Sequence, residues 1–202
     1  MSSSKLLTTY MPLEISKESI KESKDSNNGK MILKGIMQRA DAVNQNGRIY
    51  PRSVLEREVE NYQRLIKDNR ALGELNHPES STISLDKVSH IVREMKWDGD
   101  DVIGTIELLE TPMGKIAQSL VESGVKLGIS SRGVGSVYDQ GDYKVVGSDF
   151  ILICLDMVAD PSTSNAFMLA EGLNIEFDSR KHLGSNENLF RLLDSALNRF
   201  VK

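Results

Sequence analysis

The sequence feature that most constrains the fold is a pair of strand-like runs separated by a short turn. The runs are Lys87–Trp97 and Asp101–Leu109, and Asp98-Gly99-Asp100 lies between them. Aspartate and glycine favour the tight backbone turn of a β-hairpin. A hairpin is stable only when further elements cover its sheet, so the sequence predicts a domain built around strands.

Other parts of the chain supply further strands. Met31–Arg39 is apolar enough for a strand and is followed by the turn signal Asn44–Gly47. Three more strands are predicted later in the chain: Leu127–Ser131, Gly133–Tyr138 and, in some division, Tyr143–Val158. The core is therefore expected to consist mainly of strands.

Helices are predicted in three places. Pro51 suits the first position of a helix, and the apolar residues after it recur on one face. Thr111 is a candidate cap for a second helix, which Pro112 begins and Gly124 ends. A third helix is predicted at the end of the chain, over Leu189–Phe200. Together these elements predict an α+β fold dominated by strands.

The chain is expected to contain one folded domain with loose ends. The stretches 16–30 and 174–188 are polar or lack hydrophobic periodicity, and we interpret both as linkers. We therefore divide the sequence into a flexible lead-in (1–30), a folded domain (31–171) and a linker with a terminal helix (172–202). A chain of 202 residues can bury a sizeable core without a disulfide or a metal.

Composition argues against several classes of protein. The formal net charge of −4 gives no positive field to hold a nucleic-acid backbone, so DNA and RNA are poor candidates for partners. The single cysteine, Cys154, cannot form an internal disulfide and fits a reducing compartment. No apolar run is long enough to span a membrane and the N-terminus makes a poor signal peptide, which predicts a cytoplasmic protein. Cys and His residues lack metal-ligand spacing and no glycine-rich phosphate loop is present, so no cofactor is predicted.

Two segments contain residue types used in nucleophilic catalysis. His77 lies between Asn76 and Pro78 in a segment too irregular for a helix, and an imidazole there can face a cleft and act as a general base. Ser130 and Ser131 lie among glycines, which leave space around a nucleophilic hydroxyl. The alternative interpretations are a surface histidine without a task and a strand that ends in a glycine turn.

A third segment places one carboxylate, Asp156, inside the apolar run Ile151–Val158. A buried carboxylate needs a partner that carries a positive charge or donates a hydrogen bond. An arginine or lysine partner would give Asp156 a structural role. An imidazole N–H would give it the orienting role of the carboxylate in a serine triad. The residues alone leave both interpretations open.

Two blocks taken together resemble one protein family. Residues 73–78, GELNHP, and residues 128–133, GISSRG, resemble motifs of the prohead core proteases of T-even-like myophages. Residues 44–51, NQNGRIYP, resemble the segment of that family before its first long helix, and the resemblance runs from about Met31 to Phe167. It implies a serine endopeptidase with a fold similar to the herpesvirus assemblins, in which helices ring a β-barrel-like core.

The resemblance also implies roles for individual residues. His77 matches the general base, Ser130 the nucleophile and Asp156 the third member of a triad. By their chemistry rather than by the resemblance, the N–H groups of Arg132 and Gly133 are candidate oxyanion donors, and the Arg132 cation is a candidate contact for a substrate glutamate. The implied substrates are scaffold, core and capsid proteins inside the immature phage head, within the host cytoplasm. A homo-oligomer is one option for the state of the enzyme.

Self-cleavage is a further implication of the resemblance. The family cuts after a glutamate that follows Leu or Ile and any one residue, and before a small residue. Leu169–Gly172 has the sequence LAEG, so Glu171 and Gly172 flank the predicted cut. The cut would lie at the edge of the folded domain and would remove residues 172–202.

Two alternatives stand beside this reading. One is a structural or scaffolding protein of the virus particle that has the same fold without the activity. Such a protein is expected to have lost at least one of His77, Ser130 and Asp156, whereas all are present. The other is a small-molecule serine hydrolase, but Arg132 occupies the position of the last glycine in the G-x-S-x-G motif of that class.

Overall fold

The computed structural model describes residues 5–7, 24–25, 27–78, 80–159 and 168–170. The chain divides into one unit of residues 1–172 and another of residues 173–202, and the described residues all belong to the first. The predicted cut at Glu171 and Gly172 and the predicted terminal helix lie outside the described residues.

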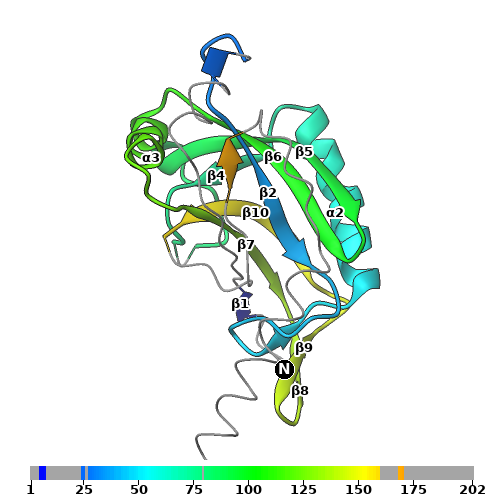
Figure 1. Ribbon diagram of the computed structural model, residues 1–202. Helices are drawn as coiled ribbons and strands as arrows, with labels where there is room; N and C mark the ends of the chain where they lie inside the picture. The colour runs from blue at the N-terminus through cyan, green and yellow to red at the C-terminus, as the bar shows by residue number, and fades with distance from the viewer. Residues whose placement is uncertain (1–4, 8–23, 26, 79, 160–167, 171–202) are drawn as a thin grey trace, which may run out of the picture. The chain divides into compact units, whose positions relative to one another are not determined.

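The largest sheet contains the predicted hairpin. Its five strands have the order β11-β2-β6-β5-β4, and each neighbouring pair is antiparallel (Figure 1). The strands are β2 (Ile32–Arg39), β4 (Leu72–Glu74), β5 (Val88–Asp98), β6 (Asp101–Leu108) and β11 (Leu169–Ala170). Asp98 pairs with Asp101 across the turn, where Gly99 has a φ of 58°. The hairpin prediction is confirmed.

A second sheet unites the segments that carry Ser130 and Asp156. Its central strand is antiparallel to both neighbours, and the sheet comprises β1 (Lys5–Leu7), β7 (Gly128–Gly135) and β10 (Ile151–Val158). The predicted break between Ser131 and Gly133 is wrong, because β7 continues through both. Gly133 provides close packing rather than a turn: a Cβ there would lie 2.5 Å from the ring of Phe150.

Strand β10 contains a bulge that sets which residues face each other. The register of its pairing with β7 shifts by one residue between Leu152 and Cys154, so Ile153 is the extra residue. A bulge of this kind bends the strand and re-aims its side chains. Beyond the bulge, Asp156 lies directly opposite Ser130.

The third sheet is small and lies in the part of the sequence predicted to divide into several strands. It has the order β3-β9-β8, with β3 (Arg48–Ile49) parallel to β9 (Tyr143–Val146) and β8 (Val137–Gln140) antiparallel to it. The predicted run Tyr143–Val158 therefore divides into β9 and β10.

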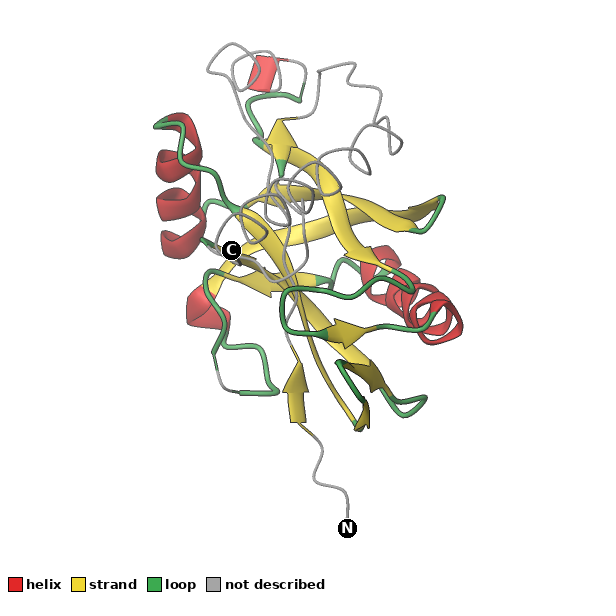
Figure 2. Cartoon of the chain, turned by 60° about the horizontal axis from the view of Figure 1, so that its bottom comes forward, coloured by secondary structure: helices red, strands yellow, loops and turns green. Residues whose placement is uncertain are grey.

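Two helices flank the strands (Figure 2). α2 (Arg52–Lys67) begins directly after Pro51 and buries the apolar face predicted from its sequence. α3 (Pro112–Glu122) begins after Thr111, whose side chain accepts a hydrogen bond from the Gly114 N–H at 3.1 Å. Both helix predictions are confirmed. A single 3-10 turn, η1 (Leu85–Lys87), precedes β5. In the part of the chain that the structure describes, no helix has the length and apolar character needed to cross a membrane.

One hydrophobic core joins the two larger sheets and both helices. Its buried members include Leu33, Val59, Ile106, Ala117, Ile129 and Met157. β4 also approaches β10 directly, because Leu75 bridges to Met157. The described strands form three sheets and no closed barrel. The prediction of a strand-dominated α+β fold is confirmed, whereas the barrel-like, assemblin-like arrangement stays a prediction.

Candidate active site

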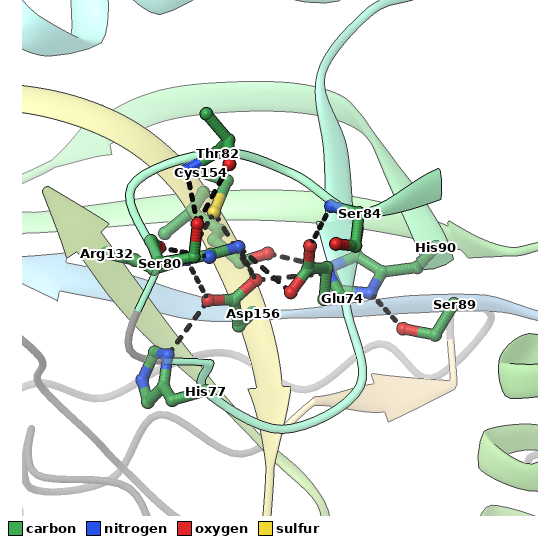
Figure 3. Close-up of polar contacts among 11 residues, drawn as sticks. Glu74, His77, Ser80, Thr82, Ser84, Ser89, His90, Arg132, Cys154 and Asp156 are labelled. Atoms are coloured by element: carbon green, nitrogen blue, oxygen red, sulfur yellow. Dashed lines mark hydrogen bonds and ion pairs between the residues drawn. The ribbon is translucent and has the colours of Figure 1, made fainter. Parts of the chain in front are cut away.

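His77 lies in the irregular segment that follows β4. Its neighbour Asn76 has a φ of 68°, a left-handed conformation that asparagine tolerates better than most residues. The Asn76 N–H donates to the carbonyl of Met157 at 2.8 Å, which holds this segment against β10. The left-handed backbone at Asn76 ends the extended strand, and Pro78 has no N–H with which to continue its pairing, so the chain leaves the sheet here. The His77 side chain is 21% exposed and turns toward β10 (Figure 3).

The His77 ring contacts the carboxylate of Asp156. Nδ1 of the ring lies 2.8 Å from Oδ2 of Asp156. An ionised carboxylate only accepts hydrogen bonds, so Nδ1 carries the proton in this pair and Nε2 is left with its lone pair. Among the described residues, the buried Nε2 has no hydrogen-bond partner. The pair has the arrangement of an imidazole base that a carboxylate orients.

Asp156 is fully buried on β10, and several groups stabilise its charge. The Glu74 N–H donates to Oδ1 at 3.1 Å, and Nη2 of Arg132 donates to the same oxygen at 3.1 Å. Burial by itself raises the pKa of the Asp156 carboxyl. The hydrogen bond from His77 and the charge of Arg132 outweigh burial and hold that pKa below its ordinary value. Asp156 is therefore ionised at neutral pH.

Ser130 lies directly opposite Asp156 in the ladder between β7 and β10. Residues that pair directly across two strands place their side chains on the same face of the sheet, so Ser130 is on the face of Asp156. Ser131 faces the other side, where its hydroxyl accepts a hydrogen bond from Nε2 of Gln38 at 2.9 Å. The strand register therefore distinguishes two serines that are adjacent in the sequence.

Arg132 is fully buried, and its guanidinium points into the cluster around Asp156 (Figure 3). Nη1 donates to the carbonyl of Ser80 at 2.7 Å, and Nε donates to Sγ of Cys154 at 3.1 Å. These contacts do not support a direct contact between this side chain and a substrate. The backbone of Gly133 belongs to the ladders with β1 and β10, and its role as an oxyanion donor stays a prediction.

Glu74 and Cys154 also belong to the polar cluster around Asp156, and neither was identified from the sequence. Glu74 is fully buried on β4, and its carboxylate accepts a hydrogen bond from the Ser84 N–H. The Cys154 thiol donates to Oδ1 of Asp156 at 3.3 Å, and burial raises its pKa, which keeps it protonated. Glu74 could have been noticed as an acid three residues before His77 in a short strand. Cys154 carries no such local signal.

His90 lies behind the cluster on β5 and has a structural role. Its Nε2 donates to the carbonyl of Leu155 at 2.9 Å, and its Nδ1 lies 2.8 Å from the hydroxyl of Ser89. Burial lowers the pKa of His90 to about 4, so the ring is neutral under ordinary conditions. The sequence interpretation of His90 as a residue of a sheet face agrees with this position.

Comparison with known proteins identifies the family. The family of prohead core protein serine proteases matches residues 4–175, which is most of the chain. This chain belongs to that family. Membership in the prohead core proteases makes it a peptidase, and it confirms the resemblance inferred from residues 73–78 and 128–133.

A sequence and a solved structure, both from phage T4, are similar to this prohead core protease. The prohead core protein protease of Enterobacteria phage T4 is 35% identical over 144 residues, which cover 68% of this chain and 68% of the relative. The solved structure of the bacteriophage T4 capsid assembly protease, gp21, matches with a TM-score of 0.67 and 28% identity. That match covers 79% of this chain and 99% of the solved chain, so the described fold is the fold of a prohead protease.

Proposed function

We propose that this prohead core protease is a serine endopeptidase in which Ser130 is the nucleophile, His77 the general base and Asp156 the residue that orients His77. The contact of 2.8 Å between Nδ1 of His77 and Oδ2 of Asp156 carries the proposal. The register that places Ser130 opposite Asp156 supports it further. A base, its orienting carboxylate and a hydroxyl thus belong to one side of β7 and β10.

In the proposed reaction, Oγ of Ser130 attacks the carbonyl carbon of the scissile peptide bond while Nε2 of His77 accepts the hydroxyl proton. The resulting imidazolium is stabilised by Asp156, which already accepts a hydrogen bond from Nδ1. His77 then donates the proton to the leaving amine, and the acyl group stays on Ser130. A water molecule then attacks the acyl carbon while Nε2 accepts one of its protons. As the bond from the acyl carbon to Oγ breaks, Nε2 returns this proton to Oγ, which releases the acid product and restores Ser130 and the neutral His77.

The proposed substrates are scaffold, core and capsid proteins inside the immature head, within the host cytoplasm. The names of the T4 relatives, a prohead core protein protease and a capsid assembly protease, support this choice. The alternative is a structural protein of the particle that keeps the fold without activity. The contact between His77 and the buried, ionised Asp156 favours an active enzyme, because a structural protein has no use for an imidazole in this state.

Ser130→Ala and Ser131→Ala form a matched pair that tests the nucleophile. Ser130→Ala is expected to lower kcat by roughly 10⁴-fold or more, as expected when a triad nucleophile is lost. Ser131→Ala removes only the hydrogen bond with Gln38, so kcat is expected to stay within about tenfold of the wild type. Hydrolysis of a peptide with the sequence of residues 166–175 measures both. Equal losses in the two variants, or the reverse order, would show that the assignment is wrong.

The same enzyme is proposed to cut its own chain between Glu171 and Gly172. The sequence of residues 169–172 supports this, as does the boundary between the two units, which follows Gly172. A cut there requires an extended backbone that a protease can reach, and such segments are typical of the edges of domains.

Mass spectrometry of the incubated protein tests self-cleavage. Wild-type protein is expected to lose the segment that begins at Gly172, while Ser130→Ala and Glu171→Gln stay at full length. Glu110→Gln is the control, because Leu108–Thr111 also fits the cleavage pattern but lies between β6 and α3. This variant is expected to be processed like the wild type. A wild-type chain that stays intact while it cleaves the peptide substrate would rule out the proposed cut.

A further inference from the structure

Arg132 is a buried cation that faces two buried carboxylates. Its Nη2 donates to Oδ1 of Asp156 at 3.1 Å and lies 3.3 Å from Oε2 of Glu74. All three side chains are 0% exposed. Burying an ion pair costs about as much desolvation energy as the attraction returns, so such a cluster is a poor device for stability alone. Its position beside the His77–Asp156 contact indicates a different purpose.

The guanidinium is held so that it fixes the orientation of Asp156. Nη1 is anchored by the carbonyl of Ser80 at 2.7 Å, and Nε is anchored by Sγ of Cys154 at 3.1 Å. With these two positions set, the planar guanidinium places Nη2 against Oδ1 of Asp156. The other carboxylate oxygen, Oδ2, lies 2.8 Å from Nε of Arg132 and also faces Nδ1 of His77 at 2.8 Å, so the guanidinium contacts both oxygens of Asp156. A lysine could supply the charge at this place but not the rigid planar geometry.

The charges around His77 balance only when its ring is protonated. The Arg132 guanidinium forms ion pairs with the carboxylates of Glu74 and Asp156, so these three side chains together carry one net negative charge, and a proton on His77 cancels it. Without Glu74, the Arg132 charge would already cancel that of Asp156, and the imidazolium would form an excess positive charge in a buried site. Glu74 therefore favours the protonated ring that catalysis requires, and Arg132 opposes premature protonation.

Three other titratable groups lie near Asp156, and none contributes a charge. Cys154 on β10 and Tyr62 on α2 stay neutral, because burial raises the pKa of each. His90 on β5 is also neutral, because burial lowers its pKa to about 4. The electrostatic setting of His77 and Asp156 among the described residues therefore comes from Arg132 and Glu74.

We infer that Arg132 and Glu74 are positioning residues for the peptidase: Arg132 fixes the carboxylate of Asp156 toward His77, and Glu74 offsets the Arg132 charge so that His77 can take up a proton during turnover. This inference rests on the proposed function for the role of His77. It assigns Arg132 to the interior of the site rather than to substrate recognition.

The test uses Arg132→Gln, Arg132→Lys and Glu74→Gln with two readouts. The first is the pH profile of kcat/KM on the peptide with the sequence of residues 166–175. The second is the NMR titration of the His77 ring in a Ser130→Ala background, with the signal assigned by its absence in His77→Gln.

The two charge-removing variants, Arg132→Gln and Glu74→Gln, are expected to have opposite effects: one raises both midpoints and the other lowers both. Loss of the Arg132 charge favours the protonated ring, so Arg132→Gln should raise the acid-limb midpoint and the ring-titration midpoint by about one pH unit. Glu74→Gln should lower both by about one pH unit for the converse reason. Arg132→Lys keeps the positive charge but loses the planar guanidinium, so its midpoints should stay near those of the wild type. Because Asp156 is then held less firmly, kcat should fall about ten- to a hundredfold.

A purely structural role predicts a different pattern. In that case all variants lose activity or stability, but Arg132→Gln and Glu74→Gln do not shift the His77 midpoints in opposite directions. This result overturns the inference. If Arg132→Gln does not fold, Glu74→Gln and Arg132→Lys still decide between the two roles. The double variant Glu74→Gln/Arg132→Gln removes one charge of each sign, and its His77 midpoint is expected to return toward that of the wild type.

The two readouts also separate this inference from the proposed function. The ring titration is measured in protein without Ser130, so it needs no activity. Peptidase activity that survives Ser130→Ala would refute the proposed nucleophile and leave the ring titrations to judge Arg132 and Glu74. Ring titrations that do not move would refute only the positioning role.

Discussion

Replacement of Asp156 by asparagine gives the sharpest test of the proposed chemistry, because its neighbours fix how the new amide will lie. Nη2 of Arg132 and the N–H of Glu74 both donate to Oδ1 at 3.1 Å. In Asp156→Asn the amide oxygen is expected to keep this place, since an NH2 group there would face these two donors and the Cys154 thiol, which also donates to Oδ1. The NH2 group then takes the place of Oδ2, between Nδ1 of His77 and Nε of Arg132. Because the Nε–H donates to Sγ of Cys154, the group able to accept from this NH2 is Nδ1 of His77.

The amide is therefore expected to reverse the tautomer of His77. Nδ1 becomes the acceptor and Nε2 carries the proton, so Nε2 cannot accept the proton of Ser130. A neutral amide also gives no charge stabilisation to the imidazolium. The same exchange in a serine triad costs about 10⁴-fold in kcat, which is about 5 kcal/mol of transition-state stabilisation. We expect a loss of this size for Asp156→Asn.

Hydrolysis of the peptide with the sequence of residues 166–175 measures kcat, and the nitrogen chemical shifts of His77 report the tautomer. Thermal unfolding verifies that the variant is folded. Asp149→Asn is the control, because Asp149 is an exposed carboxylate whose partner is Ser136 rather than a residue of the candidate site. A folded Asp156→Asn variant with kcat within about tenfold of the wild type would refute the reasoning, since no triad loses its orienting carboxylate so cheaply.

Two further predictions concern stability around the site. Burial lowers the pKa of His90 to about 4, whereas the unfolded ring titrates near its ordinary value of about 6.5. The unfolded state therefore binds a proton more readily, and the free energy of unfolding is expected to fall by up to about 3 kcal/mol as the pH decreases from about 6.5 toward about 4. Urea denaturation at several pH values should show this decrease, and it should be smaller in His90→Gln. If the free energy of unfolding depends on pH equally in the variant and the wild type, His90 is not its cause. Gly73→Ala would place a Cβ 2.2 Å from both Nε2 of His90 and the carbonyl oxygen of Leu155. Its free energy of unfolding should fall by about 1–3 kcal/mol or more, and an unchanged Tm would show that the strands can separate there without cost.

Local signals in the sequence were sufficient for most of the secondary structure. Pro51 and Thr111 are the cap residues directly before α2 and α3; the Thr111 hydroxyl accepts from an N–H of the first turn of α3, where Pro112 lacks an N–H that would otherwise need a partner. Gly99 closes the hairpin because its positive φ is a local requirement. The prediction failed at Gly133, where a glycine that usually marks a turn instead makes room for the ring of Phe150.

The candidate site could be predicted only in part, because its contacts join residues that are far apart in the chain. His77 and Asp156 are 79 residues apart, and no local pattern specifies their contact; the family resemblance supplied it. The partners of Arg132 come from β4, β10 and the segment after β4, so no local pattern indicates that its side chain lies inside the protein. The choice between Ser130 and Ser131 becomes physical only when the register with β10 is known.

The bulge between Leu152 and Cys154 separates two stretches of ladder, and it marks where homologous chains can change length. Deletion of Ile153 would convert the bulge to regular pairing and leave Asp156 opposite Ser130. Deletion of Cys154 or Leu155 would have the same effect on the register, because Ile153 fills the vacated ladder position, and only a second deletion before Asp156 would turn that carboxylate to the other face of the sheet. Related chains can therefore lose one residue between Leu152 and Asp156 without moving the carboxylate, whereas the loss of two residues there turns it away from Ser130.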